Sequence, residues 1–228
     1  DHKRKIRAHY AALVKQIDDE VGAILAALEE QGQLDNTVII FASDHGDYLG
    51  DHDLIGKGTF YESSIHIPLI LAGPGVDGPQ VNDELVALTD VTATLLHLAG
   101  ADLPPYLDAR PLPGAGADRT PHDLLYGMVS DGWMAYDSRW KLCKYTTGDL
   151  LLFDLETDPT EQVNRLRDPA CRDVLLRLDA LLGQELMRSV RLANEDRRVY
   201  TDSLFADPGF GMRGWQRRYP KPLEGKDA

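Results

Sequence analysis

The sequence predicts an α/β domain, in which helices flank a mainly parallel sheet, followed by a small α+β domain with an antiparallel sheet. Apolar residues recur at helical spacing from His9 to Leu28, which indicates an amphipathic helix that ends near Gly32 and lies with one face on a sheet. The apolar, β-branched run at 37–42 is typical of a strand buried on both faces of a parallel sheet. Short apolar segments beyond residue 130, separated by turn residues, indicate an antiparallel meander.

The remaining elements divide the chain into two folded regions and a tail. Further strands and helices are predicted at 67–72, 90–98, 133–136, 140–145, 150–155 and 170–190. Gly100 closes the helix at 90–98, and the helix at 170–190 is expected to cover the meander. The proline- and glycine-rich stretch 111–116 is typical of a surface linker. The predicted parts are therefore the α/β domain at 1–110, the α+β domain at 111–196 and an extended tail at 197–228.

The acidic composition excludes two classes of partner. Asp and Glu total 37 against 24 Lys and Arg, and the formal net charge of -13 repels nucleic-acid phosphates and anionic membrane surfaces. No run reaches the roughly 18 apolar residues that a membrane span requires. We therefore expect no nucleic acid and no membrane among the partners. Cys143 and Cys171 are too few for a disulfide framework and are expected to be unpaired, partly buried thiols.

Polar side chains gather directly after the strand predicted at 37–42. Asp44 offers a carboxylate and His45 an imidazole nitrogen, and adjacent residues in a turn can direct both groups at one cation. Gly46 lets the backbone bend sharply beside them. An Asp-His-Gly tripeptide by itself is more often a polar turn without a ligand. Its position favours a site, because ligands of open α/β sheets bind at the carboxyl ends of strands.

Lys57 is the candidate for contact with an anion. Glycines at 56 and 58 flank it and allow close approach of the backbone, so its ammonium can meet an anionic group bound at the cation. An acidic protein that handles an anionic ester needs such local positive charge in its cleft.

The stretch from Thr37 to Leu71 resembles the sulfatase family of the alkaline-phosphatase superfamily. The residues that carry the resemblance are the strand ending Ser-Asp-His-Gly, the turn Leu-Gly-Asp-His, then Gly-Lys-Gly, Tyr-Glu-x-Ser and Pro-Leu-Ile. Further similar pieces extend the resemblance over most of residues 5–170. It implies an alkaline-phosphatase-like fold, with residues 1–110 as the C-terminal part of the catalytic domain.

The resemblance also implies roles for four residues. Asp44 and His45 would be ligands of one divalent cation, with Ca²⁺ expected and Mn²⁺ or Mg²⁺ as alternatives. Lys57 would be the catalytic lysine that contacts the substrate and stabilises developing charge. His52 is a further candidate for substrate contact, although a lone histidine in a turn is more often structural.

The nucleophile of the family has no counterpart in this sequence. Sulfatases convert a Cys or Ser in Cys/Ser-x-Pro/Ala-x-Arg to formylglycine and pair it with an Asp-Asp motif from an N-terminal strand. Neither Cys143 nor Cys171 has that context. The sequence opens at Asp1 without a methionine or an apolar signal region and enters a helical pattern almost at once. We therefore expect formylglycine on an N-terminal part of a longer protein, and no activity from this chain alone.

Three functions remain open. The first is hydrolysis of a small anionic sulfate ester by the complete protein. The second is hydrolysis of phosphonate monoesters or phosphodiesters on the same scaffold, with which histidine rather than asparagine at position 45 is compatible. The third is a non-catalytic fragment or binding module. The aromatic residues beyond Arg197 suggest an intersubunit arm, and hence a homo-oligomer.

Overall fold

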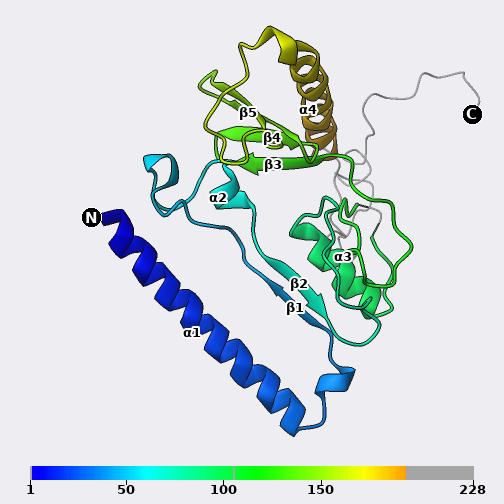
Figure 1. The fold of residues 1–228 in the computed structure, drawn as a ribbon. Helices are drawn as coiled ribbons and strands as arrows, with labels where there is room; N and C mark the ends of the chain where they lie inside the picture. Colours follow the sequence, from blue (N-terminus) through cyan, green and yellow to red (C-terminus); the bar gives the residue numbers. More distant parts are fainter. Residues whose placement is uncertain (1, 105, 194–228) are drawn as a thin grey trace, which may run out of the picture. The chain divides into compact units, whose positions relative to one another are not determined.

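A computed structural model describes residues 2–104 and 106–193 (Figure 1). The chain forms two compact units, Asp1–Leu175 and Leu176–Ala228. The helices are α1 (His2–Glu30), α2 (Glu62–Ile65), α3 (Thr89–Leu98) and α4 (Arg172–Ala193), with 3-10 turns η1 (Leu34–Asn36), η2 (Asp51–Asp53) and η3 (Pro169–Cys171). The strands are β1 (Ile39–Ala42), β2 (Leu69–Ala72), β3 (Leu125–Val129), β4 (Gly132–Tyr136), β5 (Trp140–Tyr145) and β6 (Leu150–Asp154).

Strands β1 and β2 form an antiparallel pair, with Ile39 opposite Ala72 and Ala42 opposite Leu69. The mainly parallel sheet expected from the sequence is therefore not confirmed, because the described part of this sheet holds these two strands and they run in opposite directions. An apolar run indicates burial and carries no information about the direction of the neighbouring strand. Residues of β1 are half-buried, and Ile70 of β2 is 57% exposed.

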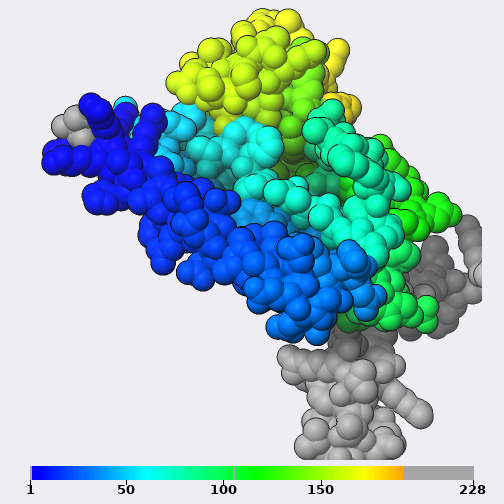
Figure 2. Space-filling view, turned by 60° about the horizontal axis from the view of Figure 1, so that its bottom comes forward, coloured from blue at the N-terminus to red at the C-terminus, as the bar shows by residue number. Residues whose placement is uncertain are grey.

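Helix α1 confirms the predicted helix and begins earlier, at His2. None of its side chains is buried, and its apolar stripe is more than half exposed at Leu13, Val14, Ile17 and Ile24. In the space-filling view the helix forms open surface along its whole length (Figure 2). The expected contact of this face with a sheet is not made by the described residues.

The second sheet is an antiparallel meander in the order β3-β4-β5-β6. The predicted strands β4, β5 and β6 are confirmed, and β3 adds an edge strand that the sequence did not indicate. Its core contains Leu142 and Leu152, both fully buried, and a cluster of Phe60, Met134 and Cys143. Phe60 comes from the segment that follows β1, so this core also holds the region of the candidate site.

Helix α3 ends as predicted at Gly100, which has a φ of 69°. The stretch 111–116 is not the surface linker that the sequence indicated, because Leu112 is only 2% exposed and its N–H donates to Thr94 Oγ1 at 2.8 Å. The boundary predicted near residue 110 stays a prediction. The tail predicted at 197–228 lies outside the described residues.

Helix α4 matches the helix predicted at 170–190. Its predicted position over the meander stays a prediction. Among the described helices, none has the length and apolar character that crossing a bilayer requires.

Candidate metal and anion site

Asp44 and His45 follow β1 directly, and the structure brings their side chains together. Asp44 Oδ2 lies 3.3 Å from His45 Nε2, while Asp44 Oδ1 accepts the N–H of His45 at 2.9 Å. The side chain of Asp44 is 80% exposed and that of His45 is 37% exposed. The two side chains predicted to bind a cation therefore lie together at the exposed carboxyl end of β1.

The hydrogen bond of the second ring nitrogen sets the tautomer of His45. Nδ1 lies 2.8 Å from the carbonyl oxygen of Gly46, which can only accept, so Nδ1 carries a proton. In the neutral ring, Nε2 then presents a lone pair to Asp44 Oδ2. A cation bound between Nε2 and Oδ2, which lie 3.3 Å apart, would interact favourably with both acceptors. A backbone partner on the second nitrogen is also the usual support of a metal-ligating histidine.

The spacing of the two atoms fits two neighbouring ligands of one cation. Ligand distances of about 2.3 Å at a right angle place the two ligand atoms about 3.3 Å apart, which is the observed separation. In the described part of the chain, no group of three or more His, Cys, Asp or Glu side chains is placed to hold a metal. These residues therefore fit a divalent cation as two of its ligands, and the remaining ligands must come from elsewhere.

Gly46 is required by close packing. A Cβ at this position would lie 2.1 Å from the carbonyl oxygen of Ser63, and the N–H of Gly46 donates to Ser64 O at 2.8 Å. Gly46 is not among the glycines with positive φ, so the sharp bend expected from the sequence is not its role. The contact fixes the turn at 44–46 against the segment that leads into β2.

The turn after this pair carries unusual backbone strain. Leu49, His52 and Asp53 all have positive φ, between 49° and 59°. For residues with a side chain, this conformation costs roughly 1–2 kcal/mol each. Asp47 offsets part of the cost, since its Oδ1 accepts the N–H of Leu49 at 2.9 Å and that of Gly56 at 3.3 Å.

The first turns of α1 brace the same turn from outside. Lys3 Nζ lies 2.6 Å from Asp53 Oδ1, and the hydrogen bond and charge of Lys3 lower the pKa of that carboxyl. Arg7 donates from Nε to Leu49 O and from Nη2 to Asp51 Oδ1, both at 2.9 Å. The sequence did not indicate these contacts, because they join residues more than 40 positions apart. Exposed pairs of this kind contribute little energy and mainly define the register of the turn.

His52 is held by stacking. Its ring lies 3.7 Å from the ring of Tyr61, centroid to centroid, with an interplanar angle of 10°. This geometry supports the structural role that the sequence favoured for it. Contact of His52 with substrate stays a prediction.

Lys57 is exposed and lies on a loop, with one glycine on each side of it. Gly56 and Gly58 have φ values of 84° and 126°, and no atom lies within 4 Å of a Cβ built at either position. Within the described chain, no hydrogen bond or ion pair holds the ammonium of Lys57 or joins it to Asp44 and His45. A hydrogen bond holds the loop two residues after Lys57, where Tyr48 Oη accepts the N–H of Thr59 at 2.7 Å. Lys57 is thus an exposed cation on a short loop.

The cysteines do not offer a nucleophile. Both are free and buried, as the sequence predicted. Burial raises the pKa of Cys143 to about 12 and also raises the pKa of Cys171, so both thiols stay protonated at neutral pH.

A buried ion cluster lies beside the site and was not predicted from the sequence. Lys141, Glu62 and Glu161 come together at the meander, although up to 99 positions separate them. The one signal in the sequence is a lysine inside the apolar strand at 140–143. His66, which follows α2, is 76% exposed at its side chain and pairs with Glu62 at 2.8 Å.

Comparison with known proteins defines the class. Residues 1–101 match the family model for Sulfatase. Arylsulfatase K of Xenopus laevis is 32% identical over 182 residues, which cover 71% of this chain and 34% of that protein. The multifunctional alkaline phosphatase superfamily protein PehA of Trinickia caryophylli is 33% identical over 192 residues, covering 73% of this chain and 37% of that protein. The crystal structure of the phosphonate monoester hydrolase of Agrobacterium radiobacter matches with a TM-score of 0.69 at 28% identity, covering 79% and 41% of the two chains.

The fold is therefore that of the alkaline-phosphatase-like hydrolases. Within that class, the chain belongs to the sulfatase family, which confirms the resemblance found in the sequence. The chain spans about a third to two fifths of the length of these relatives. Family membership implies a divalent cation and a formylglycine in the complete protein. The roles given to Asp44, His45, Lys57 and His52 remain predictions.

Proposed function

We propose that this chain supplies two metal ligands and the anion-binding lysine of a sulfatase that hydrolyses small sulfate esters. The complete enzyme then consists of this chain and a nucleophile-bearing segment that the sequence does not contain. The observation that supports the proposal most directly is the 3.3 Å approach of Asp44 Oδ2 to His45 Nε2 at the end of β1. The identity with arylsulfatase K also favours a sulfate ester as substrate.

Asp44 and His45 hold one face of the divalent cation in this proposal. When bound there, a cation would supply positive charge to polarise the ester and stabilise developing negative charge. The Nδ1–H bond to Gly46 keeps the imidazole in the orientation that presents Nε2. A carboxylate and an imidazole suit Mn²⁺ as well as Ca²⁺, and we propose Ca²⁺ as the resident ion.

Lys57 binds the non-bridging or leaving oxygen of the ester. An exposed ammonium that forms no hydrogen bond or ion pair with the described residues is available to an anion, and the flanking glycines allow the backbone to approach it. Its charge is worth most where negative charge develops in the transition state. Lys57 also provides the local positive charge that a chain of net charge -13 needs to attract an anionic substrate.

Hydrolysis of phosphonate monoesters is the second candidate. Two relatives favour it: the phosphonate monoester hydrolases of Agrobacterium radiobacter and of Silicibacter pomeroyi, whose structures this chain matches. Comparing kcat/KM of the complete enzyme for an aryl sulfate and a phenyl phosphonate ester decides between them. We expect the aryl sulfate to be preferred, and the reverse preference would select the second candidate.

The variant Lys57→Ala tests the role of the lysine. In the complete enzyme we expect kcat/KM to fall by about 10²–10³-fold, because one donor to developing charge is lost. We expect no change in melting temperature, since Lys57 is exposed and surface substitutions seldom change stability. Lys15→Ala removes an equally exposed lysine from α1 and should leave activity unchanged. A melting temperature that falls in step with activity would show that Lys57 is structural.

A further inference from the structure

The side chain of Lys141, on β5, is completely buried. Its ammonium donates to the carbonyl oxygen of Phe60 at 3.0 Å and to Glu161 Oε1 at 2.9 Å, and it forms an ion pair with Glu62 Oε1. Such a charge is expensive to desolvate and is retained only where partners compensate it well. An apolar side chain would fill this position in the core at a lower cost in free energy. The buried charge of Lys141 therefore requires an explanation.

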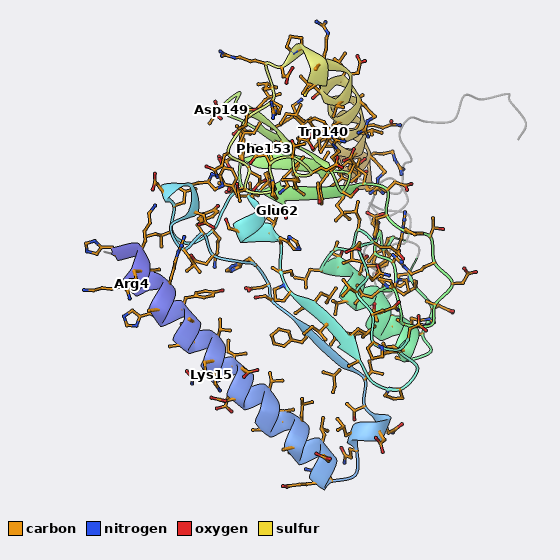
Figure 3. All side chains as sticks on the ribbon, in the orientation of Figure 1. Arg4, Lys15, Glu62, Trp140, Asp149 and Phe153 are labelled. Carbon is orange, nitrogen blue, oxygen red and sulfur yellow. The ribbon has the colours of Figure 1, made fainter. Side chains whose placement is uncertain are left out.

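The partners of Lys141 fix the chain close to the anion-binding loop. Phe60 and Glu62 lie three and five positions after Lys57. Glu161 Oε2 accepts the N–H of Glu62 at 2.7 Å, so the same carboxylate ties Lys141 to the backbone of α2. Figure 3 places Glu62 next to the strands that carry Trp140 and Phe153. The cluster thus holds residues 60–62 through the carbonyl of Phe60 and through the N–H and the carboxylate of Glu62. We call this cluster of Lys141, Glu62 and Glu161 the clamp.

Glu161 adopts a strained conformation within this clamp. Its φ is 56°, a region that residues with a side chain seldom occupy. Its side chain is nevertheless 1% exposed and points both oxygens at the cluster. Strain of this kind persists where the surrounding contacts determine the position of the residue, and it gathers at functional sites.

In the described chain, the segment after Gly58 is held by the bond from Thr59 to Tyr48, by the packing of Phe60 in the core of the meander, by the stacking of Tyr61 on His52, and by the clamp, which is the part that fixes Glu62. We propose that Lys141 is a positioning residue, which sets the place of the Lys57 ammonium through Glu62 and Glu161. This role presupposes the function proposed above, in which Lys57 meets the anion. Lys141 itself is closed off from solvent and does not touch the substrate.

A double-mutant cycle in the complete enzyme tests this role. The variants are Lys57→Ala, Lys141→Met and both together, and kcat/KM is measured per folded molecule. We expect Lys141→Met to lower kcat/KM by about 10-fold or more, since small displacements of a catalytic group cost that much. In the Lys57→Ala background the same change should cost less than about twofold, because the group that it positions is gone. Lys141→Arg restores the charge and should recover part of the loss.

Arg139→Met is the matched control. Arg139 forms an ion pair with the buried Asp154 of the same sheet and contacts none of residues 56–62 in the described structure. It should lower stability without changing kcat/KM per folded molecule. If Lys141→Met does not fold, Glu161→Gln takes its place in the cycle, since it keeps an acceptor for the N–H of Glu62 and removes the charge that faces Lys141.

The outcomes separate the two proposals. Additive effects of the two variants, or an Lys141→Met enzyme with wild-type kcat/KM, would overturn the positioning role and leave the proposed function intact. A Lys57→Ala enzyme with wild-type kcat/KM would overturn the proposed function itself. Loss of activity on Lys141→Met that vanishes in the Lys57→Ala background supports both.

Discussion

Gly46 shows how one missing side chain defines the candidate site. The backbone of the turn that carries Asp44 and His45 approaches Ser63 so closely that a methyl group does not fit between them. Gly46→Ala should therefore lower the free energy of unfolding by about 1–3 kcal/mol, as overpacking does elsewhere. Thermal or urea unfolding of the 228-residue chain measures the change.

Gly22 provides the control at the same scale. It lies in the middle of α1 with no atom within 4 Å of a Cβ built there. Gly22→Ala should raise stability by about 0.5–1 kcal/mol, because alanine favours the helix. If both substitutions had the same sign, close packing at Gly46 would not be the reason for its glycine.

Contacts between side chains at the site could be predicted from the sequence only where the two residues are neighbours in the chain. Asp44 and His45 are adjacent, so their approach could be predicted from strand position and residue type. Lys141 could not be linked to Glu62 in the same way, because 79 positions separate the two. A lysine in a strand normally indicates a solvent-facing position, and only the structure shows that this one is fully buried.

At the scale of elements, the turn between β4 and β5 is held by an ion pair that titrates. Arg139 donates from Nε and Nη2 to the two oxygens of Asp154, both at 2.9 Å. This hydrogen bonding lowers the pKa of Asp154, and partial burial opposes the shift. A carboxyl whose folded-state pKa is lowered adds stability above its ordinary pKa of about 3.9, and that stability is lost as the pH falls through the folded-state value.

The stability difference between wild type and Arg139→Met should therefore depend on pH. At pH 7 we expect about 1 kcal/mol in favour of wild type, a value reduced by solvent because Arg139 is 46% exposed. The difference should shrink as the pH falls below about 4. Urea unfolding at several pH values between 7 and 3.5 measures it. A difference that stayed constant over this range would mean that the ion pair is not its source.

Elements with strong local patterns were predictable, and their partners were not. The periodicity of α1, α3 and α4 and the turn-separated strands β4, β5 and β6 are properties of short segments. Strand β3 was missed because Gly127 interrupts a run that alternates weakly. The antiparallel pairing of β1 with β2 depends on contacts far apart in the chain, which an apolar run does not encode.

At the scale of the whole molecule, the packing density is uneven. The meander has fully buried leucines, whereas the apolar stripe of α1 is open. In the 228-residue chain, Leu13→Glu combined with Ile17→Glu should change the free energy of unfolding by less than about 0.5 kcal/mol, as surface substitutions do. Leu152→Ala, in the core, should cost about 2–5 kcal/mol. Denaturant unfolding compares the two, and a large loss from the α1 variant would mean that its stripe is packed.

The burial of Lys141 bears on how enzymes of this kind can be recombined. Because its charge is neutralised by Glu62, which lies before residue 110, the small sheet is not an independent module that can be exchanged at will. A chimera joined near residue 110 must inherit a cation at the position of Lys141 together with an acid at that of Glu161. Without both, the graft would leave the carboxylate of Glu62 without its partner, close to the loop that carries Lys57.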